Sequence, residues 1–288
     1  MAPLKIAVIL TCFNRKAHTL SAMRGIRESA HGFDVKVTLV DDGSRDGTRE
    51  AVQDQYPEVN VVVGSGDLYW NGGMRRAWQE ALDPSVDFYL WLNDDLELAP
   101  NFIRTAVDEY THATEQYGQN VIIVGKVVHP KTGEVTYGGY RKRGGLSQLS
   151  FELLGNSKDV ADTVNGNCVL IPSSAVTHIG INSDKYRHAF GDIDYGLRAR
   201  RAGYNIIQTK DPVGYQEFNL SYMDSISVLT MKNWRYILIS PKGVPFREWF
   251  EFCKDHGGPI WPVNFAFRYI KMIASGLQRA KEPLQGRN

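Results

Sequence analysis

The chain contains 288 residues, of which 43% are hydrophobic and 23% are charged, and its formal net charge at pH 7 is +1. This composition is that of an ordinary globular protein, and the near-zero charge gives no reason to expect nucleic-acid binding. The three cysteines, Cys12, Cys168 and Cys253, are widely spaced, which indicates neither a disulfide framework nor a zinc site and fits a reducing compartment.

Apolar runs alternate with helical patterns in the N-terminal part of the chain. Strands are expected at residues 5–10, 35–40, 60–63 and 88–92, and helices at residues 16–29, 48–55 and 72–82. Strands that alternate with helices predict βαβ units around a parallel sheet. Polar residues follow each strand, and ligands bind beyond the carboxyl ends of parallel strands. We therefore expect these polar residues to converge on one site.

The most informative polar segment is Asn93-Asp94-Asp95, which follows the apolar run at residues 88–92. Adjacent carboxylates repel each other, so folding alone explains them poorly. A divalent cation such as Mg²⁺ removes the conflict, because hard cations take carboxylate oxygens together with substrate phosphates. The triplet therefore points to metal-dependent chemistry on a nucleotide sugar. A polar turn that ends the strand is the alternative.

Residues 8–15, 40–48 and 93–95, in this order and spacing, resemble the motifs of family 2 glycosyltransferases of the GT-A fold. Residues 70–73, and the later segments 164–168 and 190–198, are similar to the rhamnosyltransferase-like branch. The resemblance implies an α/β fold with a mostly parallel central sheet flanked by helices. It places a catalytic domain at residues 1–223 and a helical C-terminal extension at residues 224–288. Within the catalytic domain, residues 1–98 form a Rossmann-like half that binds the nucleotide sugar, and residues 99–223 form the acceptor half.

Asp42 stands where the family has an aspartate that accepts the N3–H of a uracil or thymine ring. A carboxylate that accepts an imide N–H discriminates against cytosine. The resemblance also assigns packing of the base and ribose to the residues after the first strand, which are Thr11, Phe13, Asn14 and Arg15. An ordinary turn around Asp42 is the alternative.

The segment that begins at Gly66 is expected to pass close to the donor diphosphate. Gly72 and Gly73 permit close approach of the backbone. Asn71 is expected to cap the helix that follows, whose N-terminus would bind anions. Trp70 either packs on the donor sugar or is a buried hydrophobic residue that fixes the entry into the helix.

The resemblance assigns the metal, Mn²⁺ or Mg²⁺, to Asp95 and the donor ribose or sugar to Asp94. Asn93 replaces the first aspartate of the usual Asp-x-Asp motif, but family members often keep only the last aspartate as a direct ligand. Many relatives also carry a histidine after a later strand, which helps to bind metal or diphosphate. The matching stretch has none, so Gln216 or Glu217 is expected to substitute, or the metal is held by Asp95 and diphosphate oxygens alone.

Asp192 matches the catalytic base of the family at the start of a helix, although Gly191 replaces the glutamate that usually precedes it. An inverting transfer needs one base that deprotonates the acceptor hydroxyl. Asp194 is expected to orient this loop or cap the helix, and Asp194 and His188 are both candidate contacts to the acceptor. A plain N-cap is the alternative for Asp192.

Residues 262–288 contain five basic residues and one acid, and a helical pattern there aligns Phe267, Ile270, Ala274 and Leu277 on one face. A basic amphipathic helix can lie on an anionic membrane, and it can equally pack on the catalytic domain or on a second subunit in a homodimer. Neither a run of 18 apolar residues nor a secretory signal is evident, so we expect a cytoplasmic protein, which the membrane alternative would place at the inner face of the membrane.

Together these expectations describe an inverting, metal-dependent enzyme that moves a sugar from a UDP- or dTDP-sugar, with dTDP-rhamnose as the first candidate. The expected acceptor is a saccharide or lipid-linked saccharide of a bacterial surface glycan. A nucleotide-dependent oxidoreductase is one alternative, because Asp42 could bind a ribose, but the chain lacks Gly-x-Gly-x-x-Gly after its first strand. A non-catalytic sugar-binding module is another.

Overall fold

The computed structural model describes residues 2–144, 147–219 and 231–281. The chain divides into two compact units, one of residues 1–141 with 151–218 and the other of residues 142–150 with 219–288. Each unit is described by itself. The boundary expected between residues 223 and 224 lies outside the described residues.

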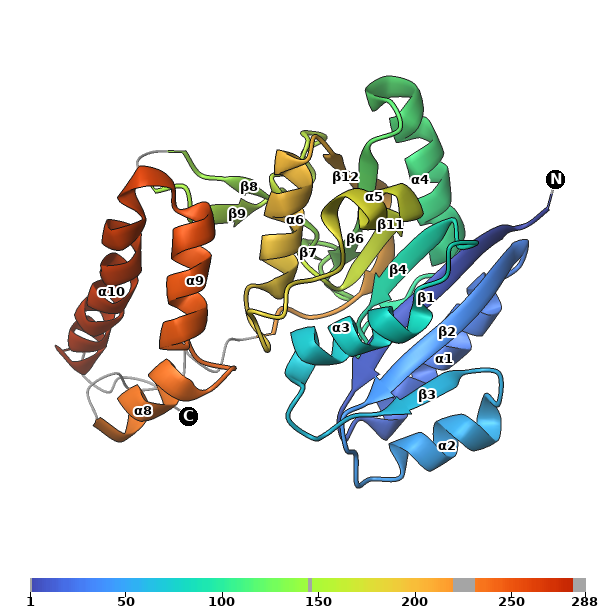
Figure 1. Ribbon diagram of the computed structural model, residues 1–288, viewed down its shortest axis with the longest axis horizontal. Coiled ribbons are helices and arrows are strands. Elements are labelled where there is room, and N and C mark those ends of the chain that lie inside the picture. Colours follow the sequence, from blue (N-terminus) through green and yellow to red (C-terminus); the bar gives the residue numbers. More distant parts are fainter. Residues whose placement is uncertain (1, 145–146, 220–230, 282–288) are drawn as a thin grey trace. The chain divides into compact units, whose positions relative to one another are not determined.

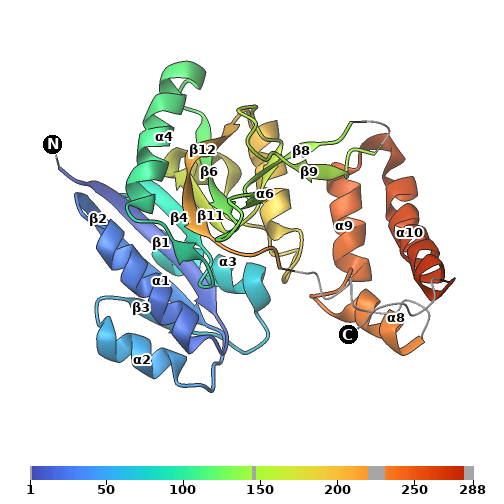
Figure 2. The ribbon, with the colours of Figure 1, turned by 180° about the vertical axis from the view of Figure 1, so that it is seen from behind.

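The first unit is built on a large mixed sheet (Figures 1 and 2). Its strands, in spatial order, are β3 (Asn60–Val63), β2 (Phe33–Asp41), β1 (Leu4–Cys12), β4 (Phe88–Leu92), β11 (Cys168–Pro172), β6 (Val121–Val128), β12 (Asn205–Tyr215) and β5 (Glu97–Leu98), and β7 (Val135–Tyr137) also pairs with β6. The strand β11 is antiparallel to both β4 and β6. The parallel pairs are β2 with β1 and with β3, β1 with β4, and β6 with β12. Strands β1 to β4, β6 and β12 therefore share one direction, which confirms the mostly parallel sheet.

Helices cover both faces of this sheet. On one face lie α1 (Lys16–Ser29), α2 (Thr48–Gln55) and α4 (Phe102–Tyr117), and on the other lie α3 (Tyr69–Ala81), α5 (Ser173–Ile179) and α6 (Gly191–Arg201). Side chains alternate across a strand, so Val8 and Leu10 of β1 enter the first core while Ala7 and Ile9 enter the second. Two helical layers around a sheet confirm the expected α/β class.

A small sheet in the order β10 (Thr163–Val164), β8 (Gly139–Lys142) and β9 (Phe151–Leu153) accompanies the large one. The second unit contains α8 (Met231–Ile239), α9 (Phe246–His256), the short 3-10 turn η1 (Gly258–Ile260) and α10 (Trp261–Lys281), which confirms a helical C-terminal part. Phe265 of α10 packs edge-on against Phe246 and Phe250 of α9, with ring centroids 5.0 and 5.8 Å apart. In the described part of the chain, every helix is too short or too polar to cross a bilayer.

Candidate active site

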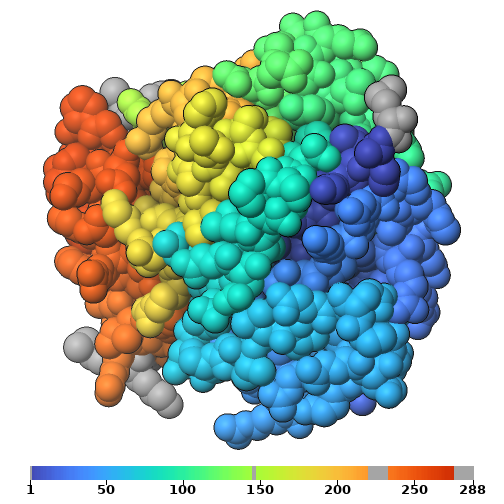
Figure 3. All heavy atoms as spheres, turned by 45° about the vertical axis from the view of Figure 1, so that its right-hand side comes forward, coloured from blue at the N-terminus to red at the C-terminus, as the bar shows by residue number. Residues whose placement is uncertain are grey.

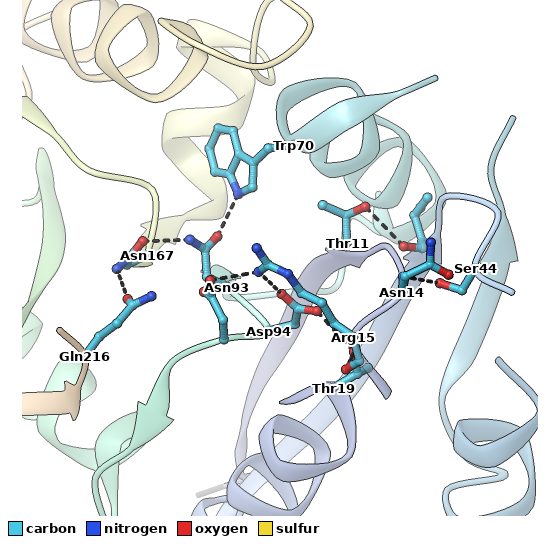
Figure 4. A network of polar contacts seen from close by, with 12 residues as sticks. Thr11, Asn14, Arg15, Thr19, Ser44, Trp70, Asn93, Asp94, Asn167 and Gln216 are labelled. Carbon is cyan, nitrogen blue, oxygen red and sulfur yellow. Dashed lines mark hydrogen bonds and ion pairs between the residues drawn. The ribbon is translucent and has the colours of Figure 1, made fainter. Parts of the chain in front are cut away.

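Asn14 joins the loops that follow β1 and β2. Its backbone lies in the left-handed region at φ 52°, which asparagine tolerates better than most residues. The Asn14 N–H donates to Ser44 Oγ at 2.9 Å (Figure 4). Asn14 Oδ1 accepts the N–H of Arg45 at 2.8 Å. Thr11 donates to a β2 carbonyl at 3.1 Å. These residues therefore shape the loops, while Phe13 is 51% exposed, so its ring is accessible.

The Asp42 carboxylate holds the segment that leads into α3. It accepts the backbone N–H groups of Gly66 at 2.8 Å, Leu68 at 2.9 Å and Tyr69 at 3.1 Å. These bonds explain why α3 begins at Tyr69, ahead of the predicted start. Gly66 suits this turn because its φ is 93°. A carboxylate has about four acceptor sites, so the predicted bond to a base imide N–H would use the one that is left.

Asn71 lies within the first turn of α3, so the prediction that it caps this helix is wrong. It is buried, and its amide donates to the carbonyls of Ser183 and Tyr186 at 2.8 and 2.6 Å. The N–H groups of Asn71 and Gly72 donate to the Arg187 carbonyl at 3.0 and 3.2 Å. This end of α3 is therefore bonded to protein groups and is not the free anion site expected. Figure 3 shows α3 (cyan) against the chain before α6 (yellow).

A row of hydrogen-bonded side chains runs from α3 to the residue after β12, at the edge where the parallel strands have their carboxyl ends (Figure 4). Trp70 Nε1 donates to Asn93 Oδ1 at 2.6 Å, and Asn93 Nδ2 donates to Asn167 Oδ1 at 2.6 Å. Asn167 Nδ2 then donates to Gln216 Oε1 at 2.7 Å. An indole N–H can only donate, so Trp70 sets the direction of the whole row. Asn93 accepts at one end and donates at the other, which an aspartate cannot do.

These hydrogen bonds distinguish Gln216 from Glu217, the two residues expected to substitute for the histidine that many relatives carry. Gln216 joins the site through Asn167, whereas the Glu217 carboxylate lies 4.0 Å from His129 Nε2. Gln216 is therefore the substitute that the geometry favours, and it brings a neutral amide in place of an imidazole.

Trp70 and Asp192 meet at Gly166. A Cβ atom on residue 166 would lie 2.3 Å from Trp70 Cζ2 and 3.4 Å from Asp192 Cβ, so the contact depends on glycine. The Trp70 ring also packs edge-on against Trp91, with centroids 5.9 Å apart. Trp70 is half-buried, so it combines a packing role with a part that a ligand can reach.

Asp192 lies in the first turn of α6, which follows Phe190 in the left-handed backbone region at φ 71°. Its carboxylate accepts the N–H groups of Gly166 at 3.0 Å and Ile193 at 2.8 Å. Burial raises the pKa of Asp192, and these bonds oppose the rise. Burial, followed by the charge of Asp192, raises the pKa of Tyr140 to about 12. Burial thus increases the proton affinity of the Asp192 carboxylate.

Asp194 and His188, the two candidate acceptor contacts, differ in their surroundings. Asp194 is 2% exposed and pairs with Arg198 Nε at 2.8 Å. Arg198 also donates to two carbonyls at the end of α5, so this ion pair packs α6 against the preceding segment. The His188 ring is half-buried, and its centroid lies 6.1 Å from that of Tyr69.

Asp94 and Asp95 both contact Arg15 after the end of β4. Arg15 Nη1 lies 3.1 Å from Asp94 Oδ1 and 2.7 Å from Asp95 Oδ2. The Thr19 hydroxyl lies 3.1 Å from the other Asp94 oxygen and 3.0 Å from the Arg15 carbonyl. Burial raises the pKa of Asp94 to about 6, although Arg15 acts in the opposite direction.

The carboxyl end of β4 fits a divalent cation. Asp95 Oδ1 is buried and has no hydrogen-bond partner among the described residues. Across the ranges that the structure describes, no cluster of three or more His, Cys, Asp or Glu side chains could hold a metal without help from a ligand. A single carboxylate completed by substrate phosphates is the mode of binding that Mg²⁺ commonly uses.

Thr19 and Asn167 were not predicted from the sequence. Thr19 stands one helical turn after Arg15 on α1, and this spacing places it on the same helix face as Arg15. Asn167 lies within a segment that resembles the family, but its bond to Asn93 joins strands that are far apart in sequence. The helical spacing could have indicated Thr19, whereas Asn167 required the sheet order.

Residues 7–166 match the sequence profile of glycosyl transferase family 2, which is more than half of the chain. The chain belongs to this family. Over 197 residues it is 25% identical to the N-acetylglucosaminyl-diphospho-decaprenol L-rhamnosyltransferase of two Mycobacterium tuberculosis strains, CDC 1551 / Oshkosh and ATCC 25618 / H37Rv. The match spans 59% of this chain and 62% of each relative. The chain therefore covers about three fifths of the length of these curated relatives.

Solved structures show the same fold at low sequence identity. The mannosyltransferase PcManGT from Pyrobaculum calidifontis, in complex with GDP-Man and Mn²⁺, is 14% identical with a TM-score of 0.57, over 99% of this chain and 77% of that one. Residues 1–349 of S. aureus TarS are 12% identical with a TM-score of 0.54, over 96% and 71%. At such identities the likeness concerns the fold alone, and it confirms the GT-A fold.

Proposed function

We propose that this chain is an inverting glycosyltransferase that moves a sugar from a nucleotide-sugar donor to a saccharide or lipid-linked saccharide. The observation that carries the proposal is a continuous set of contacts at one edge of the sheet. Trp70 bonds to Asn93, which directly precedes the paired carboxylates, and Trp70 also meets Gly166, whose N–H binds Asp192. The proposed donor site and the proposed base are thus joined through one aromatic ring.

In the proposed reaction, Asp192 accepts the proton of the acceptor hydroxyl while that oxygen attacks the anomeric carbon. The bond from this carbon to the nucleotide diphosphate breaks in the same step, so the configuration inverts. The raised pKa of Asp192 favours the proton transfer. Asp95 would hold Mn²⁺ or Mg²⁺, with Asp94 beside it, and the cation would neutralise charge on the departing diphosphate.

The donor is proposed to be a UDP- or dTDP-sugar, with dTDP-rhamnose first. Asp42 supports a uracil or thymine base because it retains one acceptor site. The rhamnosyl donor is suggested by the segment at residues 70–73 and by the name of the mycobacterial relative. A bacterial surface glycan is the corresponding acceptor.

A thermal-shift screen with UDP, dTDP, GDP and NAD, each with and without Mn²⁺, tests the nucleotide class. We expect UDP or dTDP to raise the melting temperature only when Mn²⁺ is present. Hydrolysis of a set of nucleotide sugars then identifies the donor. A shift with NAD alone would favour an oxidoreductase, and sugar binding without hydrolysis or transfer would favour a non-catalytic module.

We further propose that α10 docks on an anionic lipid surface at the inner face of the membrane. Val263, Phe267 and Ile270 are 63%, 59% and 59% exposed, and they follow one another along one face of the helix, with Ala274 after them. The opposite face packs on α9 through Phe265. Residues 261–281 contain basic but no acidic side chains, so an anionic surface complements their charge. Leu277 of the expected face lies outside the residues whose side chains are described.

Co-sedimentation with vesicles of neutral or partly anionic lipid tests this contact. Wild-type protein should bind the anionic vesicles, less strongly as salt increases, and Phe267→Asp with Ile270→Asp should abolish binding. Leu82→Asp, at a residue that is 49% exposed after α3, is the matched control and should bind normally. If the double variant instead converts a dimer to a monomer and wild type ignores vesicles, this face binds a second copy of the chain.

A further inference from the structure

One guanidinium nitrogen bridges the paired carboxylates after β4. Arg15 Nη1 lies 3.1 Å from Asp94 Oδ1 (Figure 4). The same nitrogen lies 2.7 Å from Asp95 Oδ2. The Arg15 side chain is 47% exposed, whereas the side chains of Asp94 and Asp95 are 5% and 16% exposed. A solvent-facing cation therefore covers a carboxylate pair that is almost buried.

The charges at this position do not balance. Two adjacent carboxylates carry two negative charges when ionised, and Arg15 supplies one positive charge. Thr19 adds a neutral hydroxyl bond to Asp94, and Asp95 Oδ1 is buried with no hydrogen-bond partner within the described ranges. One negative charge and one oxygen thus remain unmatched, which is costly at a buried position unless a second cation binds.

The main chain of Arg15 is anchored independently of its side chain. Its carbonyl accepts the N–H of Thr19 at 2.9 Å and the Thr19 hydroxyl at 3.0 Å, which starts α1. Movement of the guanidinium away from the carboxylates therefore requires only side-chain rotation and leaves the helix start in place.

We propose that Arg15 is a built-in counter-ion that competes with the divalent cation for Asp95. A cation on the free Oδ1 of Asp95 would lie next to the guanidinium on Oδ2, and two positive charges this close repel each other strongly. The metal therefore binds weakly while Arg15 occupies the carboxylates. A nucleotide diphosphate offers the released guanidinium charged acceptor oxygens, so nucleotide and metal bind cooperatively, a consequence that rests on the proposed function.

Titration of the protein with Mn²⁺ in the absence of nucleotide tests the competition. Electron paramagnetic resonance measures the concentration of the free ion. Arg15→Gln should bind Mn²⁺ about tenfold more tightly than wild type, the scale on which a charge at about 4–6 Å shifts an equilibrium. Lys16→Gln removes the same charge from the next residue, which is exposed, and should bind Mn²⁺ like wild type. Addition of UDP or dTDP should then tighten Mn²⁺ binding much more in wild type than in Arg15→Gln.

Arg15→Met, which keeps the aliphatic stem, is the second variant if Arg15→Gln does not fold, and melting in chelator establishes folding. The proposal is overturned if the folded variant binds Mn²⁺ no more tightly than wild type does. It is also overturned if neither protein binds Mn²⁺. The first titration contains no nucleotide, so it tests the competition separately from the proposed donor. If Arg15→Gln binds Mn²⁺ tenfold more tightly but nucleotide has no effect, the competition is supported and only the proposed donor is contradicted.

Discussion

At the residue scale, Asp192 lies inside the first turn of α6, accepts two backbone N–H groups and is the proposed catalytic base. Asp192→Asn keeps one of the two acceptor oxygens, so the cost to stability should be about 1 kcal/mol. We expect sugar transfer to fall by about two to four orders of magnitude, because the proton acceptor is lost. Donor affinity should change little. Single-turnover transfer and calorimetric donor titration measure the two effects.

The matched control is Asp184→Asn, an exposed residue in the loop before α6, which should leave transfer and donor binding unchanged. If donor binding collapses in Asp192→Asn while turnover remains high, Asp192 binds the donor or maintains structure, and the base is elsewhere.

Asn93 is the residue at which the chain departs from the usual Asp-x-Asp motif. Asn93→Asp places a third carboxylate beside Asp94 and Asp95 and removes the donor to Asn167. We expect the free energy of unfolding in chelator to fall by about 1–3 kcal/mol, because the partly buried network loses a bond. Mn²⁺ should raise the melting temperature of Asn93→Asp by more than it raises that of wild type, since the added charge strengthens the proposed cation site.

Melting curves with chelator or Mn²⁺ measure this difference, and Asn156→Asp, at an exposed position, controls for the added charge. An equal Mn²⁺ response in wild type and Asn93→Asp would mean that residue 93 is remote from the cation.

At the element scale, the site depends on the close approach of α3 and the segment before β11. Gly166→Ala would place a Cβ atom 2.3 Å from the Trp70 ring, so the ring must move. We expect a loss of about 1–3 kcal/mol in stability, the usual cost of overpacking, together with weaker donor binding. Urea unfolding and donor titration measure both.

A double-mutant cycle with Trp70→Leu separates the clash from a general effect on the backbone. The cost of Gly166→Ala should shrink in the Trp70→Leu background, because the smaller side chain leaves room for the new methyl group. Equal costs in both backgrounds would show that the glycine is required for its backbone conformation and not for contact with Trp70.

At the scale of the whole molecule, all the site residues described here belong to the first unit. Its hydrophobic cores are complete within residues 1–218, with helices on both faces of the sheet. We therefore expect a chain of residues 1–218 to fold and to hydrolyse the donor at a rate close to that of the full chain. Circular dichroism and a donor-hydrolysis assay test this, with the full chain as control. Loss of folding would show that the second unit is needed for stability.

The sequence pattern predicted strands and helices correctly where interactions between residues close in the sequence determine them. The helices at residues 16–29 and 48–55 and the strand at residues 60–63 coincide with the observed elements, because apolar spacing alone sets them. The helix predicted at residues 72–82 begins earlier, at Tyr69, because Asp42 accepts N–H groups from the segment before it. That contact joins the residue after β2 to the start of α3, which are far apart in the sequence, so it has no local signature.

The periodicity of apolar residues and the order of polar motifs were sufficient for the α/β class and the glycosyl transferase family, since both depend on patterns that are local along the chain. The partners of each polar side chain were not predictable in this way. Asn71 was expected at the helix cap but is buried against the carbonyls of Ser183 and Tyr186, and Asn93 is oriented by Trp70 and Asn167. These bonds join segments that only the folded sheet brings together, because hydrogen bonds depend on distances and directions in space.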